Sequence, residues 1–130
     1  MNFCRLFAGS VLFFAALLSG CGGGGDSASN GPYGSIAVST GRASVGISNN
    51  YTNQSDADFR AMSDCGSTCV IATRFEGVGQ CGVASFSVNG SGGIIGTGTG
   101  TKADAEIAAL KSCQSKGGAY CELWKYNCNG

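Results

Sequence analysis

Residues 34–39, with the sequence GSIAVS, return as residues 82–87, GVASFS, when the chain is aligned with itself at a shift of 48 positions (82 − 34 = 48). The same shift aligns residues 56–58, DAD, with residues 104–106, DAE. The first pair of segments is typical of strands, and the second is typical of helix starts. Agreement at one shift over both kinds of segment indicates two copies of one structural unit.

Each copy is predicted to begin with a β-hairpin. The first run in each copy is rich in strand-forming residues, and a glycine-containing turn follows it. In the second copy that turn is expected at Asn89-Gly90, because both residues tolerate positive φ. The expected strands are residues 35–39 and 43–48 in the first copy and residues 83–88 and 93–95 in the second.

A helix is predicted after each hairpin. Thr101 and Asp104 have the spacing of a capping box, and Asn53 and Asp56 occupy the matching positions in the first copy. Apolar residues then recur three apart and end on a cysteine, so we expect each of these cysteines to face the core. The two stripes are Phe59, Met62 and Cys65 in the first copy and Ile107, Leu110 and Cys113 in the second.

A third strand is expected after each helix, at residues 69–75 and 121–126, and a last cysteine closes each copy at Cys81 and Cys128. The order is therefore β-β-α-β, twice. We predict a small, disulfide-rich α+β domain over residues 33–130, built from two pseudo-symmetric repeats at about residues 34–81 and 82–128.

Six cysteines lie in this domain, three in each copy: Cys65, Cys69, Cys81, Cys113, Cys121 and Cys128. An even count in a short exported domain indicates disulfides, with fifteen possible pairings. Three per copy is odd, so full pairing needs at least one bond between the copies. A pseudo-twofold favours Cys81 to Cys128 for that bond, with Cys65–Cys69 and Cys113–Cys121 as local links.

The first twenty residues have the pattern of a removable export signal. One cation, Arg5, precedes an apolar run over residues 6–18, which is too short to span a bilayer but long enough for a signal. Residues 18–21, LSGC, look like a bacterial lipobox, in which Cys21 is acylated and becomes the new N-terminus. The alternative is an ordinary cleavage site beside a coincidental cysteine.

Residues 21–32 are expected to form a flexible tether, because this glycine- and serine-rich segment can bury nothing. Gly22 stands where aspartate commonly signals retention in the inner membrane, so we expect a lipid anchor in the outer membrane, facing the periplasm. Loss of Arg5 leaves seven basic against eight acidic side chains (8 − 1 = 7). That balance gives no reason to expect nucleic acid as a partner.

The motif order, with GSIAVS, the DAD segment before Cys65, CVIA at residues 69–72 and the helix start KADAE at residues 102–106, resembles a bacterial family. That family is catalogued as domain of unknown function 4189. The resemblance covers about residues 33–128 and implies a small, exported, cysteine-containing domain. Tyr33-Gly34 and Ile95-Gly96 stand where the family has tryptophan-glycine pairs. The family supplies no catalytic residue, so the resemblance implies fold and location rather than mechanism.

Several kinds of chemistry find no support in the sequence. The chain has no histidine, which removes histidine-dependent nucleophilic sites and imidazole-ligated metals. A thiolate metal site at Cys65 and Cys69 is the alternative to a disulfide, but an oxidising compartment favours the disulfide.

The glycine-threonine run at residues 96–102 does not fit a nucleotide motif, because its glycine, lysine and threonine stand in the wrong order. We therefore expect no catalytic residue, no metal, no nucleotide and no cofactor. Two pairs of acidic residues remain as candidates for catalysis by carboxylates, although helix capping also explains their positions. They are Asp56 with Asp58, and Asp104 with Glu106.

Tyr120, Trp124 and Tyr126 form the candidate binding surface, and alternation along a strand places Trp124 and Tyr126 on one side. Burial in the core is the alternative for these aromatic residues. The leading hypothesis is a non-enzymatic module that binds a protein or another envelope component, with an immunity or inhibitor protein as a subcase. The alternatives are a small envelope hydrolase using carboxylates and a passive structural protein.

Overall fold

The computed structural model describes residues 31–39, 41–89 and 92–130, and its elements confirm the order β-β-α-β in each of two repeats. The expected signal, Cys21 and most of the tether lie outside the described residues. The elements are β1 (Tyr33–Ser39), β2 (Val45–Tyr51), α1 (Gln54–Cys65), β3 (Cys69–Glu76), β4 (Cys81–Asn89), β5 (Gly92–Gly100), α2 (Lys102–Ser115) and β6 (Glu122–Cys128). Neither α1 nor α2 is long and apolar enough to cross a membrane.

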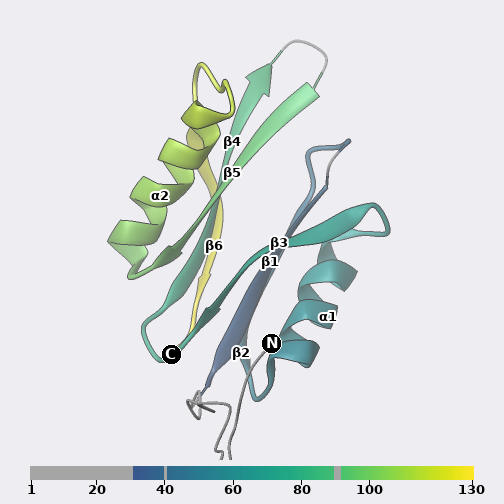
Figure 1. The fold of residues 1–130 in the computed structure, drawn as a ribbon, viewed down its shortest axis with the longest axis vertical. Helices are drawn as coiled ribbons and strands as arrows, with labels where there is room; N and C mark the ends of the chain where they lie inside the picture. Colours follow the sequence, from purple (N-terminus) through teal and green to yellow (C-terminus); the bar gives the residue numbers. More distant parts are fainter. Residues whose placement is uncertain (1–30, 40, 90–91) are drawn as a thin grey trace, which may run out of the picture.

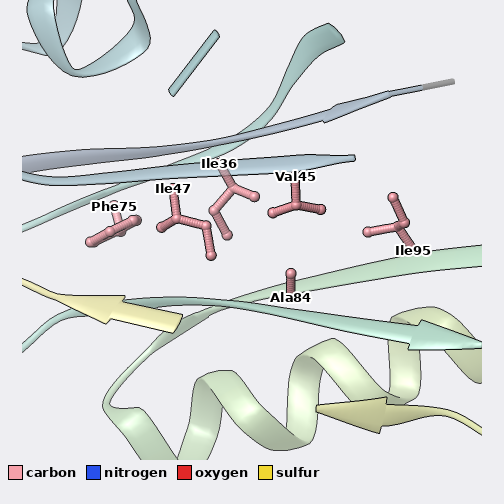
Figure 2. Packing of buried hydrophobic residues seen from close by; sticks show 6 residues of the cluster. All are labelled: Ile36, Val45, Ile47, Phe75, Ala84 and Ile95. Atoms are coloured by element: carbon pink, nitrogen blue, oxygen red, sulfur yellow. The ribbon is translucent and has the colours of Figure 1, made fainter. Parts of the chain in front are cut away.

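The strands form two antiparallel three-stranded sheets, with the orders β2-β1-β3 and β5-β4-β6. The sheets stack face to face, and each carries its own helix on its outer face, so the layers run helix, sheet, sheet, helix (Figure 1). Apolar side chains from both sheets meet between them and form the main core (Figure 2). They are Ile36, Val45, Ile47, Phe75, Ala84 and Ile95.

Both helices begin at the predicted caps. The side chain of Asn53 accepts a hydrogen bond from the Asp56 N–H, and the side chain of Thr101 accepts one from the Asp104 N–H. Each interaction satisfies a backbone donor that has no partner within the helix. The capping residues therefore fix where each helix starts relative to the strand before it.

The predicted apolar stripes are wrong at their first residues, whereas Met62 and Leu110 are half-buried and the cysteines at the helix ends are buried as expected. Phe59 is 76% exposed and Ile107 is 53% exposed. The buried positions recur four apart and carry small side chains: Ala57, Ala61 and Cys65 in α1, and Ala105, Ala109 and Cys113 in α2. The helices therefore approach their sheets through alanine rather than through large apolar residues.

Glycines in the second strands explain why only small side chains fit. A Cβ atom on Gly46 would lie 2.0 Å from the backbone oxygen of Ala61. In the second repeat, a Cβ atom on Gly96 would lie 2.2 Å from the oxygen of Ala109. Because both contacts are with backbone atoms, no side-chain movement could relieve them, and each helix lies directly on a strand backbone.

The hairpins also extend beyond the expected residues. The strand expected at residues 43–48 is β2, which starts at Val45 and ends at Tyr51. The strand expected at residues 93–95 is β5, which continues through the glycine-threonine run to Gly100. Asn89 was expected in the turn but pairs with Gly92 as part of the ladder, and Gly90 lies outside the described residues.

The three predicted disulfides are confirmed, but one of them has a different role. Cys65–Cys69 and Cys113–Cys121 tie the end of each helix to the chain that enters its third strand. Cys81 opens β4 and Cys128 ends β6, so their bond lies within the second sheet. Cys81 thus belongs to the second repeat, and the prediction that this bond joins the two copies is wrong.

Candidate functional site

A groove of about 630 Å³ runs between β2 of the first repeat and β6 of the second. Consecutive residues line it on both sides, namely residues 45–47 of β2 and residues 124–127 of β6, together with Asp64 of α1. Successive residues of a strand point to opposite faces of the sheet. A groove lined by consecutive residues therefore runs along strand edges, and both repeats contribute to it.

Polar side chains of β6 reach across to the backbone of β2. Lys125 Nζ donates to the Val45 carbonyl oxygen at 3.3 Å, and Asn127 Nδ2 donates to the Ile47 carbonyl oxygen at 2.8 Å. Asn49 of β2 donates in the reverse direction, from Nδ2 to the Cys128 oxygen at 2.8 Å. These contacts hold the two edges in register and join the two repeats.

The last residues of the domain strengthen the same junction. Asn129 is almost fully buried, and its side-chain oxygen accepts a hydrogen bond of 2.8 Å from the Asn50 N–H. Its side-chain nitrogen donates to the Pro32 oxygen at 2.7 Å. One buried amide therefore ties the end of β2 to the residue that precedes β1 and to the C-terminal segment.

A second groove, of about 200 Å³, lies along β6, and it is lined by Val83 of β4, Glu106 of α2 and residues 123–126. Residues 124–126 line both grooves, so this part of β6 forms a ridge between them. Leu123 is 46% exposed, which adds an aliphatic side chain to the ridge.

The predicted aromatic surface is exposed rather than part of the core. Trp124 is 40% exposed, Tyr126 is 54% exposed and Tyr120 is 87% exposed. Trp124 and Tyr126 line the groove between β2 and β6, whereas Tyr120 lies before β6 and lines neither groove. The structure thus brings two of the three predicted residues together at one site.

The expectation that Trp124 and Tyr126 share one side of the strand is wrong, because β6 contains an irregularity. Ala84 pairs with Lys125 and Ser85 pairs with Leu123, which leaves Trp124 as an extra residue. The Trp124 ring lies 5.4 Å from that of Phe86, which packs against the core between the sheets.

The Tyr126 ring faces the other side of the sheet. Its centroid lies 4.2 Å from Nζ of Lys102 in α2. Val83, which pairs with Tyr126, belongs to the cluster of small side chains under that helix. The two rings therefore flank the strand, one on each side of the second sheet.

The candidate carboxylates separate into capping residues and one polar cluster. Asp56 and Asp104 lie beside the helix caps, where Asp56 accepts a hydrogen bond from Asn53 and Asp104 accepts one from Thr101. Glu106 lies 3.9 Å from Lys102 in an ion pair. The contacts of Asp56 and Asp104 agree with the capping interpretation, whereas Glu106 takes part in an ion pair along the helix.

Asp58 lies at the centre of a cluster that the sequence did not reveal. Arg74 donates to both of its oxygens, at 2.8–3.1 Å, and Gln54 donates at 2.9 Å. The hydroxyl of buried Ser35 also donates to this carboxylate. Burial raises the pKa of Asp58. The hydrogen bonds from Arg74, Ser35 and Gln54 together lower this pKa by more than burial raises it, so the net shift is downward.

Comparison with known proteins identifies one family. The family model described as a domain of unknown function (DUF4189) matches residues 33–128. The chain belongs to this family. The match begins with β1 and ends with β6, so the DUF4189 domain consists of both repeats and includes both walls of the groove. No curated protein and no solved structure gave a match to this chain.

Proposed function

We propose that this protein is an exported lipoprotein, anchored through Cys21 in the outer membrane and facing the periplasm, whose DUF4189 domain binds a protein partner. The binding surface is the ridge formed by β6, with Trp124, Tyr126 and Leu123 as its apolar anchors. The observation that carries the proposal is the exposure of both aromatic rings beside a groove of about 630 Å³. Partly exposed aromatic residues beside a groove are typical anchors of protein interfaces.

The disulfides add support, because they hold the ridge at both ends. Cys121 precedes β6 and is bonded to Cys113 of α2, while Cys128 ends β6 and is bonded to Cys81 of β4. A strand fixed at both ends loses little conformational entropy when a partner binds. Rigidity of this kind suits an immunity or inhibitor protein, which needs export and a recognition surface but no catalytic group.

The two alternatives receive less support. A hydrolase using carboxylates needs an acid with a raised pKa near a second acid, but the pKa of Asp58 is lowered and Arg74 occupies its oxygens. In the described part of the chain, each groove along β6 has one acidic residue in its lining. The hypothesis of a passive structural protein does not explain why aromatic side chains are exposed on a rigid strand.

A pull-down from envelope extract tests binding by the ridge. The full chain, purified in detergent with its disulfides formed, should retain a specific partner, and the double variant Trp124→Ala/Tyr126→Ala should lose it. Phe59→Ala is the matched control, because it removes an aromatic side chain that is 76% exposed on α1 and lines neither β6 groove. Equal capture by all three proteins would overturn the assignment of the ridge.

The anchor has its own test. Cells grown with radiolabelled palmitate should incorporate label into the wild-type chain, and the Cys21→Ser variant should remain unlabelled. Incorporation by the variant, or release of the wild-type chain into the soluble periplasmic fraction, would contradict a lipid anchor at Cys21.

A further inference from the structure

The backbone of β6 presents hydrogen-bonding groups to the groove at Tyr126. In an antiparallel pair, positions with closely spaced Cα atoms do not exchange backbone hydrogen bonds, and these positions alternate with bonded ones. The Cα atoms of Cys81 and Cys128 are 4.0 Å apart, which assigns Cys128 to the first kind. The bond from Asn49 to the Cys128 oxygen agrees, because that oxygen faces β2.

Tyr126 lies two residues before Cys128 in regular pairing with β4. By the same alternation, its N–H and C=O groups point away from β4, on the side of the strand where the groove runs. Regular pairing from Val83 to Cys81 makes this assignment independent of the irregularity at Trp124.

The two edges in the groove differ in how they are covered. The outward carbonyl groups of Val45 and Ile47 in β2 accept hydrogen bonds from Lys125 and Asn127, so side chains of this chain already occupy that edge. On β6, the outward groups of Tyr126 lie between the rings that flank the strand. The outward Cys128 oxygen at the end of β6 accepts from Asn49. Among the described residues no side chain bonds the outward groups of Tyr126, so β6 is open to an added strand at this position.

We propose that the groove binds an extended segment of a partner protein, which adds to the edge of β6 as a further strand and pairs with the backbone of Tyr126. Backbone pairing supplies affinity, and alternate side chains of the segment contact Trp124 on one side of the sheet and Tyr126 on the other. This inference rests on the proposed function, protein binding by the ridge, and names its mode of recognition.

Two substitutions at one position separate backbone pairing from ring contact. Tyr126→Ala removes the ring and keeps the N–H, whereas Tyr126→Pro removes both. Because this N–H points away from β4, the proline costs no hydrogen bond of the β4–β6 ladder, so both variants should fold. Equal thermal midpoints of the two variants are the check.

The probe is a linear peptide of twelve residues, selected from a random display library against the full chain in detergent with its disulfides formed. Trp124 is the only tryptophan of the chain and lines the groove, so its fluorescence reports binding directly. We expect Tyr126→Pro to bind the selected peptide about tenfold more weakly than Tyr126→Ala, which is the effect of one lost backbone hydrogen bond.

Hydrogen exchange provides a second measurement that needs no variant. The bound peptide should slow exchange of the Tyr126 amide in the wild-type chain at least tenfold. Equal affinities of the two variants, an unprotected Tyr126 amide, or a library that yields no peptide acting on Trp124 fluorescence would each overturn strand addition. A partner captured from envelope extract in a ridge-dependent way would still support protein binding, so the two proposals fail separately.

Discussion

The two repeats place different chemistry at four equivalent positions. In the first repeat these positions hold a hydrogen-bonded cluster around a carboxylate, and in the second they hold an aliphatic residue, an ion pair and an aromatic ring. The equivalent pairs are Ser35 and Val83, Gln54 and Lys102, Asp58 and Glu106, and Arg74 and Tyr126. The first three pairs are 48 residues apart, and the last is 52 apart (126 − 74 = 52) because the second helix-strand loop is longer.

The irregularity in the third strand is shared as well. Ile36 pairs with Thr73 and Ala37 pairs with Ile71, which leaves Ala72 as the extra residue in β3. Trp124 is the extra residue at the same place in β6. The two repeats therefore share this backbone irregularity, although their side chains differ. The first repeat uses the helix side of its third strand for an internal ion pair. The second repeat has exposed Tyr126 at that place and exposed Trp124 on the opposite side of the strand.

The largest expected difference between the repeats concerns the disulfide that only the second one has. Cys81 and Cys128 correspond to Tyr33 and Glu76 of the first repeat, which pair without a covalent bond. The Cys81–Cys128 bond closes 47 residues, so chain entropy predicts that Cys81→Ala/Cys128→Ala lowers the free energy of unfolding by about 4 kcal/mol. Urea unfolding at pH 7 measures this change.

The matched control removes a short loop. Cys65 and Cys69 are four residues apart, so Cys65→Ala/Cys69→Ala should cost only about 2 kcal/mol by the same relation. Equal losses in the two double variants would show that loop length does not set the stabilisation. The asymmetry between the repeats would then have to come from packing around the sulfur atoms.

Local chemistry in the sequence was enough to predict the element order, the helix caps and the disulfide pairs. The cap residues act within three positions of each other, and Cys65 and Cys69 occupy places equivalent to those of Cys113 and Cys121. The Cys81–Cys128 pair was predicted correctly but from the wrong symmetry, because both cysteines belong to the second repeat. The buried alanine stripes could not be predicted in this way, because they depend on Gly46 and Gly96 of other elements. A helix that lies directly on a strand backbone must carry small side chains at the contact, so its larger side chains are exposed.

The candidate site was predicted only in part for a related reason. Alternation along β6 correctly indicated a strand with aromatic residues, but the extra residue at Trp124 reverses the side on which its ring lies. The groove itself depends on β2, whose carbonyl groups accept from Lys125 and Asn127 at a sequence separation of 80. No local pattern reports a contact of that kind.

A smaller effect is expected from the polar cluster of the first repeat. Asp58→Asn should lower the free energy of unfolding at pH 7 by about 1 kcal/mol, because the carboxylate is largely covered but Arg74 is solvent-exposed. Since folding lowers the pKa of Asp58, its contribution is complete above the unfolded value of about 3.9 and is lost as pH falls through the folded value. Urea unfolding across this acid range measures the loss.

The equivalent carboxylate of the second repeat is the control. Glu106 is 3.9 Å from Lys102, Lys102 is exposed and Glu106 is partly exposed, so Glu106→Gln should change the free energy of unfolding by less than about 0.5 kcal/mol. If Asp58→Asn and Glu106→Gln changed the free energy of unfolding equally at every pH, the cluster around Asp58 would add no stability beyond that of a surface ion pair. The two repeats would then not differ in electrostatic stabilisation.

The smallest expected effect differs in sign between the repeats. Ser39 and Ser87 are equivalent, but the Ser39 hydroxyl accepts a hydrogen bond of 2.9 Å from the Arg42 N–H, whereas the buried Ser87 hydroxyl has no hydrogen-bond partner among the described residues. Ser39→Ala should therefore destabilise the domain by about 0.5 kcal/mol, and Ser87→Ala should be neutral or slightly stabilising. Thermal unfolding of the two variants side by side measures the difference. A loss on replacing Ser87 would mean that its hydroxyl is satisfied in solution, and the second repeat would then resemble the first at this position.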